Sequence, residues 1–395
     1  MILCGGSGTR LGALTAATPK PLLDVGGRPF LDVLLLELGR HGFDDVILLA
    51  SFKSEQVARY IADNAVARRV GIKLSLSIEP ERAGTGGALY HARHLADAEF
   101  LLLNGDSWFD INLLGIGETA AYADADVVMA VREIDNAERY GVVVLDGTAI
   151  TEFLERPRQP GPGLVNAGVY RVRKQIFARL EAKCSFERDT LPALSRDGRV
   201  RAVVRQGYFI DIGVPDTFAR AQTEVPAHQR RKAIFLDRDG VINHDLGHVG
   251  SIERFNWIDG SIEAIRALNE SGALVFVVTN QAGVARGLYT EDDVRLLHAY
   301  MQRELRRRGA HIDDFRYCPD HTEAKIERYR RASSWRKPNP GMLLDLMAAW
   351  RIEPAGCHMI GDRSTDIEAG QAAGVQAHHF TGGNLLNFVR SAGIV

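Results

Sequence analysis

The stretch that most constrains the fold of this chain is residues 233–243, where four apolar residues run directly into two acids and a glycine. The apolar run predicts a strand that is buried on both faces, as in a parallel sheet. Asp237, Asp239 and Gly240 follow at its carboxyl end, which is where open α/β sheets bind ligands. Two carboxylates so close together repel each other, and a divalent cation is the simplest compensation. The stretch therefore predicts either an acidic catalytic site or an ordinary Asp/Gly turn after a strand.

The size and charge of the chain limit its class. At 395 residues we expect two or more domains. A formal net charge of −2 provides no basic field for nucleic acid or a membrane surface. The four cysteines are scattered without a C-x-x-C pair, so a disulfide framework is not expected. No apolar run approaches the length of a membrane span, and no signal peptide is visible at Met1. We expect a cytoplasmic protein without nucleic-acid or membrane partners.

Apolar runs and amphipathic segments alternate along the chain in two series, separated by a polar stretch at 223–232. Such alternation predicts an α/β fold in which helices cover a mostly parallel sheet. We therefore expect two doubly wound domains, at 1–222 and 233–395, joined by a linker at 223–232. The first domain is expected to have strands at 1–4, 45–51, 73–78, 99–104, 126–131, 141–145, 167–173 and 201–205, and helices at 29–41, 54–64, 86–96, 174–182 and 216–222. The second is expected to have strands at 233–236, 273–279, 314–317 and 357–360, and helices at 260–271, 291–308, 341–350 and 365–373. Thr290 with Asp293 is the expected N-cap of the helix at 291–308.

A glycine-rich loop follows the first predicted strand. Residues 3–11 hold three glycines, followed by Thr9 and Arg10. Glycines let backbone N–H groups curve round a polyphosphate, and an arginine adds a planar cation for it. Lys20 lies between two prolines, close in sequence, and is placed to meet a second phosphate. The loop is not a Walker loop, and a tight turn is the alternative interpretation.

Two acids at separate places suggest a cation site in the same domain. Asp106 ends a strongly apolar strand in Asn-Gly-Asp, and Asp211 lies in Phe-Ile-Asp-Ile-Gly. Two such acids suit a cation that bridges the phosphates of a nucleotide. Residues 79–87 add another glycine turn, which would bring backbone close to a flat base.

The ordered motifs G-G-S-G-T-R-L, P-K-P, E-P-x-x-x-G-T-G-G, N-G-D, N-A-G-V-Y and D-I-G-V-P resemble the sugar-1-phosphate nucleotidyltransferases over essentially all of residues 1–222. The resemblance implies a Rossmann-like sheet and attack of a sugar-1-phosphate oxygen on the α-phosphorus of an NTP, with release of pyrophosphate. Guanine is the base that the resemblance favours. By motif position, Arg10 and Lys20 would contact the reacting phosphates, Asp106 and Asp211 would hold Mg²⁺, and the substrates would meet Gly5, Gly6, Gly8, Thr9, Gly84, Thr85, Gly86, Glu155, Arg156, Asn166 and Gly168.

Two features depart from that family. The family usually has Glu-Lys-Pro where this chain has Glu155-Arg156-Pro157, and arginine keeps the charge but not the compact geometry of lysine. The chain also begins only two residues before Leu3, so the first strand is expected to be short. A native start upstream of Met1 stays open.

Polar groups end further strands of the second series. Thr279 follows an apolar run, and the segment that holds Asp362 and Asp366 follows another. Lys337 lies between them in the sequence and precedes a proline. Because the carboxyl ends of parallel strands converge on one crevice, one site would hold all of these with Asp237 and Asp239. In that site Asp237 would be the nucleophile that forms an aspartyl-phosphate, and Asp239 would protonate the leaving group and then activate water. Lys337 and a magnesium ion held by Asp237 and Asp362, with Asp239 beside them as a further ligand, would offset the phosphoryl charge.

The motifs L-D-R-D-G, T-N-Q-A-G-V-A-R-G, Y-C-P and R-K-P-N-P-G-M resemble the haloacid dehalogenase superfamily from about 232 to 385. More narrowly, they resemble the D,D-heptose 1,7-bisphosphate phosphatases and the related histidinol phosphatases. This resemblance implies that Arg336 helps to grip a second phosphate and that Asn280 and Arg286 touch the substrate.

That narrower group usually has a structural zinc loop, and this chain departs from it. Cys318 is present, but Asp320, Ser333 and Trp335 occupy the other ligand positions. Zinc requires a full tetrahedral set of N and S ligands, so no zinc is expected here. The loop 318–335 must then be held in another way, with Trp335 as an apolar plug.

The fusion itself suggests a function. A phosphatase that removes the distal phosphate of a sugar bisphosphate makes a sugar-1-phosphate, which a nucleotidyltransferase consumes. The leading hypothesis is a bifunctional enzyme that needs Mg²⁺ at both sites. It would dephosphorylate D-glycero-D-manno-heptose 1,7-bisphosphate at C7 and then transfer GMP from GTP to the heptose 1-phosphate. The alternatives are a mannose-type guanylyltransferase fused to a phosphatase of different substrate, and a chain in which one domain only binds. A homo-oligomer stays open.

Overall fold

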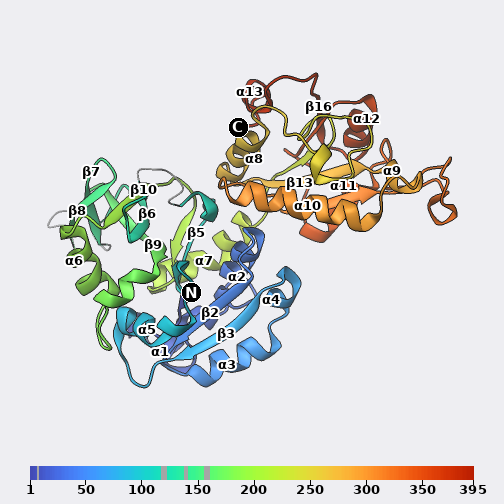
Figure 1. Cartoon of the computed structure of the whole chain (residues 1–395). Coiled ribbons are helices and arrows are strands. Elements are labelled where there is room, and N and C mark those ends of the chain that lie inside the picture. The colour runs from blue at the N-terminus through green and yellow to red at the C-terminus, as the bar shows by residue number, and fades with distance from the viewer. Residues whose placement is uncertain (7–8, 117–121, 138–140, 155–160) are drawn as a thin grey trace. The chain divides into compact units, whose positions relative to one another are not determined.

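The computed structural model describes residues 1–6, 9–116, 122–137, 141–154 and 161–395 (Figure 1). It divides into two compact units, Met1–His228 and Gln229–Val395. Among the described residues, no helix has the length and apolar content needed to cross a membrane.

The first unit is built on a nine-stranded sheet in the order β3-β2-β1-β4-β9-β6-β10-β8-β7. Its strands are β1 (Ile2–Leu3), β2 (Asp45–Ala50), β3 (Lys73–Ile78), β4 (Glu99–Asn104), β6 (Val127–Ile134), β7 (Val142–Asp146), β8 (Ala149–Leu154), β9 (Gly163–Arg173) and β10 (Val200–Val204), and a separate pair is formed by β5 (Ser107–Phe109) and β11 (Phe209–Asp211). The α-helices are α1 (Ala13–Ala17), α2 (Phe30–Arg40), α3 (Ser54–Asp63), α4 (Ala65–Val70), α5 (Gly84–Ala92), α6 (Leu191–Arg196) and α7 (Pro215–His228).

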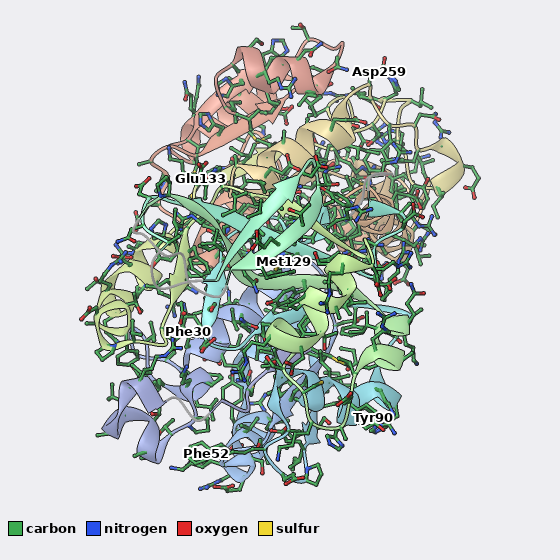
Figure 2. The ribbon with its side chains drawn as sticks, turned by 90° about the vertical axis from the view of Figure 1, so that its left-hand side faces the viewer. Phe30, Phe52, Tyr90, Met129, Glu133 and Asp259 are labelled. Carbon is green, nitrogen blue, oxygen red and sulfur yellow. The ribbon has the colours of Figure 1, made fainter. Side chains whose placement is uncertain are left out.

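Two apolar clusters, one on α2 and one around β6, form the core of this unit. Phe30 belongs to the first and Met129 to the second, and both are fully buried (Figure 2). The short pair β5–β11 matters for function, because its register sets Asp211 opposite Ser107 and hence beside the turn that carries Asp106. The fold thus brings together two acids that lie 105 positions apart in the sequence.

The second unit has a five-stranded sheet in the order β14-β13-β12-β15-β16, and every pairing in it is parallel. Its elements are β12 (Ala233–Leu236), α8 (Ser261–Glu270), β13 (Leu274–Asn280), α9 (Ala282–Ala285), α10 (Glu291–Arg306), β14 (Asp314–Cys318), α11 (Gly341–Trp350), β15 (His358–Gly361), α12 (Ser364–Ala372), β16 (Gln376–His379) and α13 (Leu385–Ser391).

The central strand β12 shows why this unit is doubly wound. Ile234 and Leu236 lie in an apolar cluster with residues of α8, α10 and α13, whereas Ala233 and Phe235 lie in a second cluster with residues of α11 and α12. Both faces of the sheet are therefore covered by helices, as the unbroken apolar run predicted. The strand order reverses between β12 and β15, and open sheets of this kind bind ligands at such a reversal.

Three expectations from the sequence need correction. The first unit's sheet is mixed rather than mostly parallel, because β9 runs antiparallel to β4, β6 and β7. The segment 223–228, predicted as linker, is helical, since α7 continues to His228 and keeps Ala221 and Val225 buried. The helix predicted at 174–182 is a 3₁₀ helix, Lys174–Arg179. By contrast, the N-cap predicted at Thr290 is confirmed as a capping box with Asp293.

Candidate active sites

In the first unit, the glycine loop follows β1, as predicted. Gly5 lies against β2 and β3, where an added Cβ would stand 3.3 Å from the Ser51 Cβ and 3.4 Å from Glu79 Oε1. Arg10 is exposed on the short 3₁₀ helix Thr9–Leu11. The predicted residues Gly8, Glu155 and Arg156, and the side chain of Thr9, lie outside the described part of the structure.

Lys20, Asp106 and Asp211 form the charged centre of this unit. The Lys20 Nζ lies 3.0 Å from Asp106 Oδ2, and the backbone N–H of Gly213 donates to Asp211 Oδ1 at 2.6 Å. Burial, together with the negative charge of Asp106, raises the pKa of Asp211 to about 6. A buried carboxylate that lies beside a second carboxylate is the environment that a divalent cation relieves. The donor set, oxygen atoms only, fits Mg²⁺.

The structure places Asn166 and Gly168 near this centre. The Gly168 backbone N–H donates to Asn166 Oδ1 at 2.9 Å, and Asn166 donates to the Tyr170 hydroxyl at 2.6 Å. Gly168 has φ +72°, and a Cβ there would meet the side chain of Asn104 at 2.8 Å. Only glycine suits this turn of β9, which packs against the strand end that leads to Asp106.

Gly84, Thr85 and Gly86 begin helix α5, and the structure gives them partners within the protein. The Gly86 N–H donates to the Cys184 carbonyl at 3.0 Å, and the Thr85 hydroxyl donates to Glu187 Oε2 at 2.5 Å. A Cβ on Gly84 would stand 2.5 Å from the Cys184 carbonyl oxygen. These glycines thus allow α5 to pack on segment 184–187, and their contact with a base stays a prediction.

In the second unit, a buried lysine links two carboxylates at the carboxyl ends of the strands. Lys337 Nζ lies 2.9 Å from Asp237 Oδ1 and 2.6 Å from Asp366 Oδ1, and it donates to the Val278 carbonyl at 2.8 Å. Lys337 is 3% exposed and Asp237 is 7% exposed. The sequence predicted that Asp237, Lys337 and Asp366 meet at one site, and the structure places them together.

The acids around Lys337 fit a divalent cation. Among the described residues, Asp237, Asp362 and Asp366 offer oxygen atoms that lie within 4.8 Å of one another. Burial raises the pKa of Asp237 to about 7, although the Lys337 ammonium opposes the shift, and burial also raises the pKa of Asp362. Asp362 Oδ1 is buried without a hydrogen-bond partner, which is costly unless a cation meets it.

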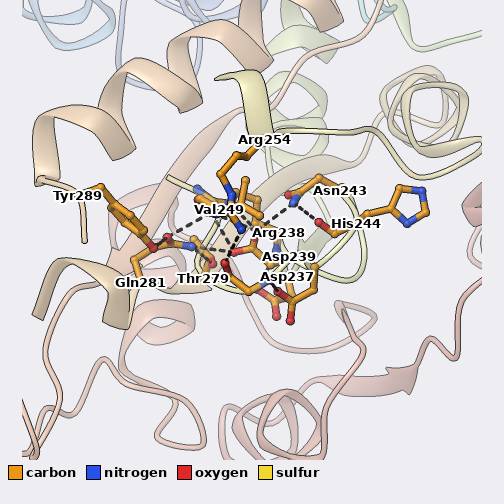
Figure 3. A network of polar contacts seen from close by, with 12 residues as sticks. Asp237, Arg238, Asp239, Asn243, His244, Val249, Arg254, Thr279, Gln281 and Tyr289 are labelled. Carbon is orange, nitrogen blue, oxygen red and sulfur yellow. Dashed lines mark hydrogen bonds and ion pairs between the residues drawn. The ribbon is translucent and has the colours of Figure 1, made fainter. Parts of the chain in front are cut away.

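Asp239 has a different environment from the one that the sequence predicted (Figure 3). Its carboxylate accepts hydrogen bonds from Arg238, from Asn243 Nδ2 at 2.9 Å and from Gln281 Nε2 at 2.9 Å. Both Asp239 oxygens already accept hydrogen bonds within the protein. The set of metal ligands that the structure suggests therefore contains Asp366 where the sequence predicted Asp239. Arg238 is completely buried, which sequence reasoning did not anticipate, and Gln281 was missed with it.

Arg286 and Arg336, the residue before Lys337, have no carboxylate partner among the described residues. Arg336 donates to the Asp320 carbonyl at 3.1 Å, and Arg286 contacts His248 Nε2 at 3.2 Å. Burial lowers the pKa of Arg336, and the Arg286 charge lowers it further. Two uncompensated cations that repel each other form a site for an anion. Asn280 exchanges two 3.0 Å hydrogen bonds with the Lys337 backbone, and its contact with substrate stays a prediction.

In the loop 318–335, where the related phosphatases have their structural zinc, an ion pair joins two segments. Arg331 Nε lies 2.9 Å from Asp320 Oδ2, and burial raises the pKa of the Cys318 thiol. Trp335 is half-buried and packs against the apolar cluster that includes Cys318. A thiol that resists ionisation and a carboxylate already paired with arginine do not fit zinc.

We therefore expect metal analysis of the purified protein to find no stoichiometric zinc, even after zinc is added and unbound metal removed. We also expect a strong chelator to leave the thermal unfolding of the second unit unchanged when Mg²⁺ is kept in excess, because no zinc closes the loop. Adding Mg²⁺ serves as the matched control, since it should bind at the separate acidic site. One zinc ion per chain, bound with Cys318, would contradict this.

Comparison with known proteins agrees with the two units. Residues 1–228 match the nucleotidyl transferase family, and residues 334–384 match the HAD-hydrolase-like family. A Rhodopseudomonas palustris protein named D-glycero-beta-D-manno-heptose-1,7-bisphosphate 7-phosphatase is 50% identical over 161 residues, which are 41% of this chain and 89% of that protein. A Campylobacter jejuni protein named D-glycero-alpha-D-manno-heptose 1-phosphate guanylyltransferase is 35% identical over 220 residues, 55% of this chain and 96% of that protein.

A solved structure resembles the first unit. HddC from Yersinia pseudotuberculosis, complexed with GMP-PN, is 34% identical and has a TM-score of 0.50, covering 57% of this chain and 97% of its own. The chain therefore belongs to the nucleotidyl transferase family through its first unit and to the HAD-like phosphatases through its second, and it is an enzyme that joins the two.

Proposed function

We propose that this chain converts D-glycero-D-manno-heptose 1,7-bisphosphate to GDP-heptose in two steps. The second unit removes the 7-phosphate, and the first unit transfers GMP from GTP to the remaining 1-phosphate. The observation that carries the proposal is the Asp237–Lys337 ion pair at the buried nucleophile, together with Arg286 and Arg336, which have no carboxylate partner among the described residues. Such a site suits a substrate with a second phosphate. We place both steps in the cytoplasm, where nucleoside triphosphates are made.

In the phosphatase step, an Asp237 carboxylate oxygen attacks the phosphorus of the 7-phosphate, and the bond from phosphorus to the sugar oxygen breaks. Asp239 gives its proton to that oxygen. Water then attacks the phosphorus and passes a proton to Asp239, the bond to Asp237 breaks, and inorganic phosphate leaves. Mg²⁺ held by Asp237, Asp362 and Asp366 would supply charge neutralisation to the phosphoryl oxygens. Lys337 supplies a further positive charge at the same place.

In the transferase step, an oxygen of the heptose 1-phosphate attacks the α-phosphorus of GTP, and the bond to the β-phosphate breaks with release of pyrophosphate. Positioning and charge neutralisation supply most of the catalysis in such transfers. Arg10 and Lys20 stabilise the reacting phosphates. Mg²⁺ held by Asp106 and Asp211 would supply further neutralisation. Guanine is supported by the names of the relatives rather than by a contact in this structure.

A coupled assay tests the proposal. The protein is incubated with the bisphosphate and each NTP in turn, and inorganic phosphate, pyrophosphate and the nucleotide sugar are quantified. The α and β anomers are tested separately, because the relatives' names differ in anomer. We expect phosphate and GDP-heptose in equal amounts from one anomer. If no NTP gave pyrophosphate, the transferase half would be refuted. If neither anomer gave phosphate, the phosphatase half would be refuted.

The two arginines give a prediction about binding. Arg336→Lys is expected to raise KM for the bisphosphate about 10-fold, because lysine keeps the charge but loses the planar two-pronged contact with phosphate. KM for p-nitrophenyl phosphate, which has no second phosphate, should change less than about 2-fold. Steady-state kinetics with both substrates checks this.

Arg307→Lys, at an exposed arginine paired with Glu304 at 2.8 Å, is the matched control and should change neither constant. Equal changes of KM for both substrates in Arg336→Lys would show that Arg336 does not bind the second phosphate.

A further inference from the structure

A buried glutamine, Gln281, bridges the Arg238 guanidinium and the carboxylate of Asp239, the proposed acid–base residue (Figure 3). Gln281 is 1% exposed. Its Oε1 accepts from Arg238 Nη2 at 3.1 Å, and its Nε2 donates to Asp239 Oδ2 at 2.9 Å. Only this orientation of the amide works, since a guanidinium can only donate and a carboxylate can only accept. The second N–H of the same amide donates to Thr279 Oγ1 at 2.8 Å.

Tyr289 completes this network from outside the strand ends. Its hydroxyl donates to Gln281 Oε1 at 2.7 Å. The amide oxygen therefore has two donors, which oppose rotation of the amide, and both amide N–H bonds stay directed at Asp239 and Thr279. A Phe in place of Tyr289 would keep the ring but remove one of the two donors.

The chain leaves a space for the Tyr289 ring. A Cβ on Gly250 would stand 2.2 Å from Tyr289 Cδ1, and a Cβ on Gly283 would stand 2.3 Å from Tyr289 Cε1 and 2.5 Å from its hydroxyl oxygen. Neither glycine has the positive φ that would itself require glycine. Both glycines therefore have a steric reason to lack a side chain, and that reason is the ring of Tyr289.

We propose that Tyr289 and Gln281 are positioning residues that hold the Asp239 carboxylate and the Thr279 hydroxyl in place for phosphoryl transfer. This rests on the proposed function, in which Asp239 protonates the leaving oxygen and then activates water. Gln281 contacts Asp239 and Thr279 directly, whereas the Tyr289 hydroxyl contacts Gln281 and acts through it. Hydrogen bonds to a charged partner are among the stronger ones in proteins, so the bond from Gln281 favours one rotamer of Asp239.

The leaving group distinguishes this role from simple structural support. A sugar alkoxide needs a proton from Asp239 as it leaves, whereas p-nitrophenolate leaves without one. Misplacing Asp239 should therefore slow the first turnover of an alkyl phosphate and spare that of p-nitrophenyl phosphate. Loss of general acid–base catalysis costs about 10²- to 10⁴-fold, and loosening the residue costs part of that.

The test uses the full chain with Tyr289→Phe, Gln281→Ala and the double variant. For Tyr289→Phe we expect kcat on the bisphosphate to fall about 10-fold with KM unchanged, while the first-turnover burst of p-nitrophenolate stays within about 2-fold of wild type. For Gln281→Ala the fall should be about 100-fold. Because Tyr289 acts through Gln281, the double variant should be no slower than Gln281→Ala alone.

Tyr329→Phe is the matched control, since it removes a 2.7 Å hydroxyl bond to Glu291 elsewhere in the same unit. It should leave the ratio of the two rates unchanged. Gly283→Ala, which pushes on the ring, should reproduce the selective loss, and thermal unfolding of each variant shows whether it is folded. An equal fall on both substrates in Tyr289→Phe, or full additivity in the double variant, would overturn the inference.

Failure of the proposed substrate would be visible separately. If the wild type hydrolyses p-nitrophenyl phosphate but neither anomer of the bisphosphate, the proposed function fails. The variants are then compared on glycerol 2-phosphate, as the alkyl phosphate, and on p-nitrophenyl phosphate. We again expect a loss of activity on the alkyl phosphate alone.

Discussion

Asp237→Asn is expected to abolish phosphatase turnover, with kcat at least about 10⁴-fold below wild type, and to leave GMP transfer unchanged. The amide has the shape of the carboxylate but cannot form the bond to phosphorus. The fold should tolerate the change, because Lys337 keeps its contact with Asp366 Oδ1 at 2.6 Å and with the Val278 carbonyl at 2.8 Å. The buried ammonium is thus not left without a partner, which is the usual cause of collapse in such sites.

The measurement is phosphate release from the bisphosphate, together with pyrophosphate release from GTP and separately supplied heptose 1-phosphate. Asp292→Asn is the matched control, because the Asp292 side chain is 80% exposed on α10 and pairs with a neighbouring arginine, Arg295. It should leave both rates unchanged. If both activities of Asp237→Asn fell together in a protein with normal unfolding behaviour, the picture of two independent sites would be wrong.

The strand ends of the second unit were predictable because topology alone brings them together. An unbroken apolar run, such as β12, specifies a strand buried on both faces, and parallel strands place their last residues along one edge. Asp237 follows β12, Thr279 lies near the end of β13, and Asp362 follows β15. Their meeting could therefore be predicted without knowledge of side-chain contacts. The capping box at Thr290 was predictable for a related reason, since its partner is only three residues away.

The side chains that surround those acids were not predictable. Arg238 stands between two acids in the sequence, a position that gives no sign of burial. It is fully buried because Gln281, 43 positions later, and the Val249 carbonyl meet its guanidinium. The short strands β5 and β11 have three residues each, too few for a periodic pattern. The burial of Arg238 and the pairing of β5 with β11 depend on contacts between distant segments, which a local sequence pattern does not predict.

Asp106→Ala is expected to lower kcat/KM for GMP transfer about 10³-fold, the second-largest effect that this structure predicts. Asp106 is one of two acids that would hold the cation, and its Oδ2 lies 3.0 Å from Lys20 Nζ. Removing it takes away both a metal ligand and the group that orients the lysine. The fold should survive, because the pair is partly exposed, 17% for Lys20 and 29% for Asp106, and such pairs contribute only about 1 kcal/mol or less.

Pyrophosphate release from GTP and heptose 1-phosphate, measured over a range of Mg²⁺ concentrations, checks this prediction. If Asp106 binds the cation, the variant should need more Mg²⁺ for half-maximal rate, whereas a purely structural defect would lower the rate at every concentration alike. Asp45→Ala is the matched control, since that acid is 58% exposed and lies 3.9 Å from Lys73. Phosphate release by the second unit of the same variant should stay at the wild-type rate, because the second unit carries its own acids. A variant that keeps transfer within about 10-fold of wild type at low Mg²⁺ would remove Asp106 from the metal site and leave Asp211 as the acid to test next.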